Sequence, residues 1–261
     1  MATNKYKCAV LSFIVGDYEQ IHEVEYKTPD FQYVMVTDNT ALTSTTWEVK
    51  YVENLHPEDA FDLCWKVRYN PFDYVDADVV IKIDGSMGVC GDLNYIVDYF
   101  NKEQYDIALE MHPTRNDMLS EYQAWVNQRN FPVEQANKCL NFMSANGYDV
   151  RNDKGLFQYN FMIQRKNAVN LQLNATTLKL LHDAAPEGKQ VDRLDQTLGS
   201  FIINKYFNYM KVLPVSQTIA LSGKYFKWYP HGSNTPFAYG NYEYCQPYLF
   251  GQPVNTIYMM E

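Results

Sequence analysis

The sequence predicts an α/β fold: a mainly parallel central sheet with helices on both faces. Short apolar runs rich in β-branched and aromatic residues alternate with longer stretches whose apolar residues recur every three or four positions. Parallel strands need long crossover connections, which are usually helices, so this alternation favours βαβ units. We expect one domain over residues 1–261, because no repeat, low-complexity tract or linker interrupts the chain.

The expected strands are short and apolar, and several of them end on Asp, Asn or Gly. They cover residues 7–15, 31–39, 47–53, 79–84, 105–111 and 155–167. Residues 47–53 alternate between apolar and polar side chains, which is typical of an exposed or edge strand.

The expected helices cover residues 56–72, 92–104, 118–128, 133–143, 178–185 and 192–207. Pro71 ends the first helix, because proline cannot continue the hydrogen-bond ladder. Asp92 is expected to cap the second helix. The apolar stripe of that helix consists of Leu93, Ile96, Val97 and Phe100.

The chain carries 31 acidic and 22 basic residues, which gives a net charge of −9. A protein that binds the phosphate backbone of nucleic acids needs a clustered positive surface, so we expect no nucleic-acid partner. An anionic small substrate would need local lysines or arginines, a helix N-terminus or a metal ion.

The five cysteines are widely spaced and include no C-x-x-C pair. They are Cys8, Cys64, Cys90, Cys139 and Cys245. This pattern indicates reduced thiols rather than a disulfide framework or a zinc site. The N-terminal apolar run is too short to span a bilayer and lacks a cleavage pattern of small residues. We therefore expect a cytoplasmic protein without a signal peptide or transmembrane segment.

Residues 223–261 are rich in Tyr, Phe, Gly and Pro and show no helical period. Aromatic faces suit sugar rings and nucleobases, so this segment could form a lid or an acceptor wall. An extended segment packed on the sheet edge explains the same composition equally well.

Acidic residues gather at the expected carboxyl ends of the strands. They are Asp17, Asp38, Asp84 and Glu110. Ligands of open α/β sheets bind at this edge, and a divalent cation would let an acidic rim hold a diphosphate. Asp followed by Gly is also ordinary turn chemistry, so the alternative is that Asp84 belongs to a turn without a ligand.

A dinucleotide site is a weaker alternative. Gly85, Gly88 and Gly91 follow an expected strand and precede an expected helix, and Glu110 closes the next strand. Their spacing is G-x-x-G-x-x-G rather than G-x-G-x-x-G, and Asp84 would face the pyrophosphate without a cation. An NAD-dependent oxidoreductase is therefore disfavoured.

Four segments carry a resemblance to a known family. They are "WKVRYNPFDYVDADVVIKIDGSM", "ALEMHPTRNDMLSEYQAW", "GLFQYNFMIQRKN" and "RLDQTLGSFIINK". The part "DADVVIKIDGSM" resembles the strand and acidic turn of GT-A glycosyltransferases, where a D-x-D motif binds a metal ion and a nucleotide-sugar diphosphate. In their order the segments resemble the glycosyltransferase-like family called domain of unknown function 616 and, more distantly, glycosyltransferase family 8. The likeness covers most of residues 6–232 and implies a GT-A, Rossmann-like fold.

The resemblance implies a metal site at the acidic turn. Asp84 matches the first acid of D-x-D, and Ser86 stands where the second is expected. Serine is a weaker cation ligand than carboxylate, so Mn²⁺ or Mg²⁺ would bind loosely, be held by other groups, or be absent. His231 resembles the late histidine that completes the metal site in several GT-A enzymes, with a structural or exposed histidine as the alternative.

The resemblance also implies a donor site. Lys66 and Arg68 would reach the diphosphate, with a solvated helix face as the alternative. Asp17 or Asp38 would accept from the base or ribose, with turn chemistry as the alternative. The expected donor-binding residues are Val15, Gly16, Asp17, Asp38, Lys66, Arg68, Asp84, Gly85, Ser86, His112 and Arg115.

Glycosyl transfer with inversion needs a base for the acceptor hydroxyl. The resemblance makes Asp195 the first candidate for this base and Asp192 the second. In a retaining reaction Asp195 and Gln196 would instead orient the substrate, and the alternative is that the acids only charge the first turn of a helix. Arg115 and Glu121 would form an ion pair behind the site or contact the donor sugar.

We therefore expect a glycosyltransferase that moves a sugar from a nucleotide-diphosphate sugar to a glycan or lipid-linked acceptor, as in surface polysaccharide biosynthesis. A lipid-linked acceptor is compatible with peripheral association with a membrane. The alternative from another class is a GT-A-like module that has lost catalysis and binds a glycan or nucleotide.

Overall fold

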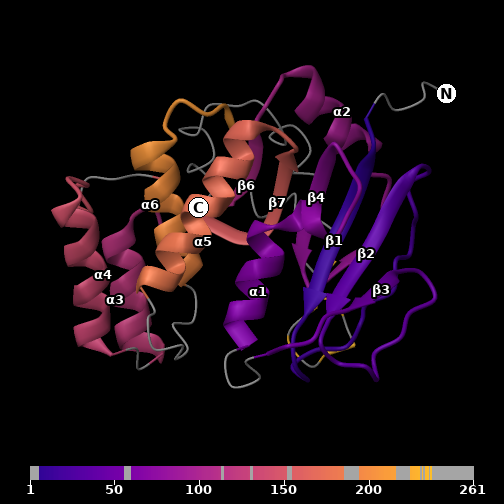
Figure 1. Cartoon of the computed structure of the whole chain (residues 1–261), viewed down its shortest axis with the longest axis horizontal. Coiled ribbons are helices and arrows are strands. Elements are labelled where there is room, and N and C mark those ends of the chain that lie inside the picture. The colour runs from indigo at the N-terminus through magenta and orange to yellow at the C-terminus, as the bar shows by residue number, and fades with distance from the viewer. Residues whose placement is uncertain are drawn as a thin grey trace.

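The computed structural model describes residues 6–55, 60–112, 115–129, 132–151, 155–184, 194–215 and 224–229, together with residues 231, 233, 234 and 236. These residues form an α/β fold around one large sheet (Figure 1). The expected fold class is confirmed at this level.

Seven strands form the central sheet, in the order β3-β2-β1-β4-β7-β6-β8. Their bounds are β1 (Cys8–Ile14), β2 (Phe31–Thr37), β3 (Glu48–Tyr51), β4 (Val79–Asp84), β6 (Ile107–Met111), β7 (Phe157–Arg165) and β8 (Val212–Val215). All pairs are parallel except those made by β7, which runs against both of its neighbours. The sheet is therefore mainly parallel, as expected, and β3 is an edge strand.

Three short strands lie outside the expected set. They are β8 and the two strands of a separate antiparallel pair, β5 (Met87–Val89) and β9 (Phe226–Trp228). Each is three or four residues long. Stretches of this length carry too few residues to show a period of two.

The pairing register brings three strand ends together. Phe13 of β1 lies opposite Asp84 of β4 in the parallel pair. Ile83 of β4 lies opposite Phe161 of the antiparallel β7, so the residues before Phe161 extend toward the same edge. The carboxyl ends of β1 and β4 and the start of β7 thus meet.

Helices cover both faces of the sheet (Figure 1). They are α1 (Ala60–Tyr69), α2 (Asn94–Lys102), α3 (Met118–Arg129), α4 (Val133–Ala145), α5 (Ala168–Ala184) and α6 (Leu194–Tyr206), with a 3-10 turn at Pro71–Asp73 after α1. The stripe predicted on α2 packs on one face with alternate residues of β1 and β4, and each of its four side chains is fully buried. On the other face α1 packs against β1, β2 and β4, and α3 to α6 pack against β6 and β7.

Two helix starts differ from the sequence prediction. Helix α2 begins at Asn94, and Asp92 accepts a hydrogen bond of 3.0 Å from the Asn94 backbone N–H instead of serving as the N-cap. Helix α5 begins ten residues before the expected 178, because its buried face there is polar. Asn170 and Asn174 occupy that face and are hydrogen-bonded to Asp106, Arg165 and Gln164. A polar buried face leaves no apolar period to detect.

The expected lid or wall of residues 223–261 falls mostly outside the described residues. Its described part runs as β9 beside β5, and Phe226 packs edge-on against Phe161 in the core. In the described residues Cys8, Cys64, Cys90 and Cys139 form no disulfide, and Cys245 lies outside them. No helix in the described ranges combines the length and apolar character needed to cross a membrane.

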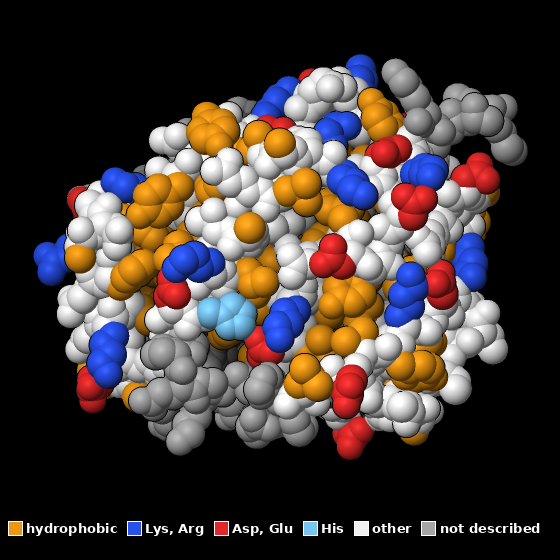
Figure 2. Space-filling model, viewed as in Figure 1, with side chains coloured by type: hydrophobic (Ala, Val, Ile, Leu, Met, Phe, Trp, Pro, Cys, Tyr) orange, Lys and Arg blue, Asp and Glu red, His pale blue; other side chains and the backbone are white. Residues whose placement is uncertain are grey.

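On the face shown in Figure 2, acidic and basic side chains are interspersed, with no continuous basic area. Surface cations also have acidic neighbours. Lys138 lies 3.0 Å from Glu134, and Lys227 lies 2.6 Å from Glu25. The absence of a nucleic-acid partner stays a prediction from the composition.

Candidate functional site

A cleft of about 470 Å³ opens where β1, β4 and β7 meet. Its polar lining comprises Arg68 from α1, Asp84 and Ser86 from the end of β4, Gln158 and Asn160 from β7, and Asp195 and Gln196 from α6. Aromatic side chains complete the walls: Phe13, Tyr18, Trp65 and Trp228. Convergent polar groups within aromatic walls are typical of a small-molecule site.

Arg68 joins two carboxylates in this cleft. Its Nη2 donates to Asp84 Oδ1 at 2.9 Å, and its Nη1 contacts Asp195 Oδ2. Burial opposes charge on the guanidinium, but its neighbours, Asp84 foremost, together outweigh burial and raise the pKa of Arg68 above its ordinary value. The guanidinium therefore stays charged and holds the end of β4 to the start of α6.

Two buried ionisable groups, Lys82 and Glu110, lie near Asp84. Lys82 is fully buried, donates to the Tyr159 carbonyl and lies 3.7 Å from Asp84 Oδ1. Burial and the neighbouring Arg68 lower the pKa of Lys82 well below its ordinary value. Glu110 is also fully buried, and burial and Asp84 raise the pKa of its carboxyl well above the ordinary value. Glu110 therefore belongs to the core rather than to an acidic rim.

Three amide oxygens of the cleft lack hydrogen-bond partners among the described residues. They are Gln158 Oε1, Asn160 Oδ1 and Gln196 Oε1, and all three atoms are buried. A buried acceptor without a donor costs about 1–3 kcal/mol, which a ligand with hydroxyl groups would recover. The wall formed by β7 and α6 is therefore suited to a polyhydroxylated ligand.

His231 also lines the cleft, beside a residue that the sequence reasoning missed. Its Nδ1 lies 3.5 Å from Oε2 of Glu19, whose side chain is fully buried, and its ring packs edge-on against Tyr18. His22 approaches the other oxygen of Glu19 at 3.7 Å, and burial lowers the pKa of His22. No pattern around Glu19 in the sequence indicates that its carboxylate lies beside His231.

The residues expected around the nucleoside are used in loop contacts, except Val15, which lines the cleft. Asp38 Oδ1 accepts from the Gly16 N–H at 2.6 Å, where Gly16 has a φ of +74°. Asp17 Oδ1 accepts from the Asn39 side chain at 2.7 Å. These contacts are the turn chemistry weighed as the alternative, and they tie the loops after β1 and β2 together.

Lys66 and Gly85 do not line the cleft either. Lys66, whose side chain is half-buried, pairs with Asp62 at 2.6 Å within α1. A Cβ at Gly85 would lie 2.6 Å from Ile14 Cγ1 and 2.8 Å from the Phe13 carbonyl. Gly85 is thus required by the packing of the chain rather than by a ligand. A Cβ at Gly91 would likewise meet the Lys224 carbonyl, so this glycine serves chain packing rather than a pyrophosphate turn.

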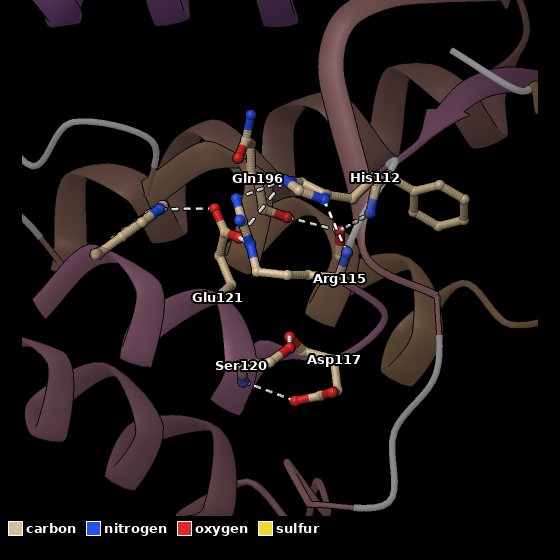
Figure 3. Close-up of polar contacts among 9 residues, drawn as sticks. His112, Arg115, Asp117, Ser120, Glu121 and Gln196 are labelled. Carbon is tan, nitrogen blue, oxygen red and sulfur yellow. Dashed lines mark hydrogen bonds and ion pairs between the residues drawn. The ribbon is translucent and has the colours of Figure 1, made fainter. Parts of the chain in front are cut away.

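His112, Arg115 and Glu121 form a network behind the cleft (Figure 3). The Arg115 N–H donates to His112 Nδ1 at 3.1 Å, and the Arg115 side chain pairs with Glu121, which is fully buried and also accepts from Trp125 Nε1 at 2.6 Å. Gln196, which lines the cleft, lies next to this network. The ion-pair alternative for Arg115 and Glu121 therefore holds, and His112 and Arg115 do not line the cleft.

The described side chains form a poor ligand set for Mn²⁺ or Mg²⁺. Oδ1 of Asp84 already pairs with the charged guanidinium of Arg68, so an added cation would compete with it. Ser86 contributes only a neutral hydroxyl, and His231 faces Glu19. Within the described ranges no cluster of three or more His, Cys, Asp and Glu side chains is placed to hold a metal ion. The cation role of Asp84, Ser86 and His231 stays a prediction.

Of the expected site residues, the structure brings together Val15, Arg68, Asp84, Ser86, Asp195 and His231. Asp192 lies outside the described residues. The sequence reasoning missed Gln158 and Asn160, although polar residues at alternate positions of an otherwise apolar strand are a readable signal.

In comparisons with known proteins, no protein-family model and no curated protein matches the chain.

Proposed function

We propose that the cleft is the active site of a glycosyltransferase with a GT-A-like fold that uses a nucleotide-diphosphate sugar. The observation that carries the proposal is a set of buried amide oxygens on β7 and α6 that have no hydrogen-bond partner in the described part of the chain and line the same cleft as the charged pair Arg68–Asp84. Sugar hydroxyls are the donors that such oxygens need, and the aromatic side chains suit the apolar face of a sugar ring.

The reaction assigned to this site is a single group transfer. The oxygen of an acceptor hydroxyl forms a bond to the anomeric carbon, while the bond from that carbon to the diphosphate oxygen breaks. The electron pair leaves with the nucleoside diphosphate, and the hydroxyl proton passes to a base. Asp195, which lines the cleft, is proposed to act as this base or, in a retaining reaction, to orient the sugar together with Gln196.

Arg68 is assigned two tasks in this account. Its contact with Asp195 keeps a carboxylate beside the wall formed by β7 and α6. Its remaining N–H donors are proposed to bind the leaving diphosphate. The acceptor is proposed to be a glycan or a lipid-linked glycan. A reducing, cytoplasmic setting is compatible with the cysteines, none of which forms a disulfide in the described residues.

A second candidate function is a glycan- or nucleotide-binding module without catalysis. It is favoured by the same Arg68, because a carboxylate held in an ion pair is a weaker base than one without a cation beside it.

The test is a panel of uridine, guanosine and cytidine diphosphate sugars, each added with and without manganese. We expect one base to raise the melting temperature and to release free nucleoside diphosphate slowly. Asp84→Ala should abolish this stabilisation, whereas Asp195→Ala should keep it and lose the release. Stabilisation without release, even with acceptors present, would favour the binding module, and stabilisation by NAD alone would refute both.

A further inference from the structure

A second groove of about 610 Å³ lies at the amino end of β1, whereas the cleft lies at the carboxyl end of that strand. It is lined by Tyr6, Gln104 and five residues of α2, namely Tyr95, Asp98, Tyr99, Asn101 and Lys102, and we call it the α2 groove. Tyr6 stands just before β1, whereas Phe13 and Val15 at the other end of β1 line the cleft. At about 3.3 Å per residue, roughly 20 Å separate the two sites.

Asn101 is the unusual member of this groove. It lies in the last turn of α2, and its side chain is only 6% exposed. Neither its Nδ2 nor its Oδ1 has a hydrogen-bond partner among the described residues. Buried amides are nearly always hydrogen-bonded, so an amide with both ends unpaired inside a groove indicates a ligand that both donates and accepts.

The other groove residues indicate the chemistry of that ligand. Tyr95 and Tyr99 lie one turn apart on α2, and Tyr95 is 57% exposed. Asp98 and Lys102 are also one turn apart, and their charges cancel. A groove with aromatic faces, a primary amide and no net charge fits a neutral ligand with hydroxyl groups better than a phosphate or a carboxylate.

We propose that the α2 groove binds a neutral oligosaccharide at a site separate from the cleft. The apolar face of a sugar ring packs on Tyr95, and hydroxyl groups pair with both ends of the Asn101 amide. The volume is within the range of small-ligand sites. This site does not depend on what the cleft does.

The experiment measures binding of maltohexaose, cellohexaose and laminarihexaose to the full chain by titration calorimetry, with an anionic heparin hexasaccharide for comparison. We expect one neutral probe to bind more tightly than the anionic probe, and Asp84→Ala in the cleft to leave this binding intact. Tyr95→Ala should weaken binding about tenfold or more, whereas Tyr209→Ala, at another exposed tyrosine, should leave it unchanged.

Asn101→Leu separates a ligand-binding amide from a structural one. It removes an unpaired amide, so it should keep or raise the melting temperature while weakening binding. Asn170→Leu is the matched control, because the Asn170 amide donates to the carbonyls of Asp106 and Arg165, and its loss should lower the melting temperature. The proposal is overturned if no neutral probe binds, if Tyr95→Ala binds like the parent, or if Asn101→Leu loses as much stability as Asn170→Leu.

Discussion

The guanidinium of Arg68 lies 2.9 Å from Oδ1 of Asp84, inside the cleft and shielded from solvent. This contact joins the last turn of α1 to the end of β4 through two residues that are 16 positions apart in the sequence. Because the same guanidinium also reaches Asp195, one side chain pairs with the two carboxylates that the proposed reaction needs.

Replacement of Arg68 should therefore cost more than loss of an ordinary surface ion pair. Arg68→Met leaves Asp84 and Asp195 without their main counter-ion, and we expect the free energy of unfolding to fall by about 3 kcal/mol in urea denaturation. Lys66→Met is the control, since the Lys66 side chain is more exposed than that of Arg68 and pairs with Asp62 within the same helix, so its loss should cost about 1 kcal/mol or less. Equal losses for the two variants would show that the Arg68 contacts are not a structural centre.

Gln196→Met tests whether the cleft wall formed by β7 and α6 binds the sugar, without removing a charge. Gln196 Oε1 has no donor among the described residues, so the variant should keep the melting temperature. Turnover of the nucleotide sugar should fall about tenfold, which corresponds to one lost hydrogen bond, while binding of the nucleoside diphosphate alone stays unchanged.

Gln164→Met serves as the matched control for Gln196→Met. Gln164 exchanges two hydrogen bonds with Asn174 in the core, at 2.8 and 3.2 Å, so its loss should lower the melting temperature. Normal sugar turnover by Gln196→Met would remove Gln196 from the proposed donor site.

The buried carboxyl of Glu110 predicts a particular dependence of stability on pH. Its pKa is raised in the folded state, so the folded protein keeps the Glu110 proton when the unfolded chain loses it near pH 4.5. Its contribution to stability is therefore full below about pH 4.5 and declines as the pH rises toward the folded-state pKa. Glu110→Gln should raise the melting temperature at pH 7 relative to the parent and change it little at pH 4.

Glu48→Gln should show the opposite sign. The hydrogen bond from Gln32 lowers the pKa of Glu48, so its contribution is present above pH 4.5 and is lost as the pH falls. The effect should be small, because Glu48 is half exposed.

A lower melting temperature for Glu110→Gln at pH 7 would indicate that Glu110 is ionised in the folded protein.

The strands and helices that are long and deeply buried could be predicted from the sequence. Strands β1 and β4 read as continuous apolar runs because both of their faces are covered, and α2 shows its stripe because only one face is buried. The direction of β7 could not be predicted, since an apolar run looks the same in either orientation. The start of α5 was missed because Asn170, Asn174 and Thr177 replace apolar residues on its buried face.

The candidate site was predictable only in part, for a related reason. Asp84 was selected because it ends an apolar strand, whereas Arg68 and Asp195 were selected through the resemblance to GT-A glycosyltransferases. Asp38 and Asp17 are of the same type, yet they bind Gly16 and Asn39, and only the tertiary contacts separate the two uses. Gln158 and Asn160 gain their importance from the antiparallel β7, which carries them to the edge where Asp84 lies.

A crystal structure of the chain with its stabilising nucleotide sugar would show whether the cleft holds the donor sugar. We predict that the sugar ring occupies the cleft, with hydroxyl groups within hydrogen-bond distance of Gln158, Asn160 and Gln196 and with the diphosphate beside Arg68. A nucleotide sugar bound at saturating concentration with its sugar away from this wall would contradict the account.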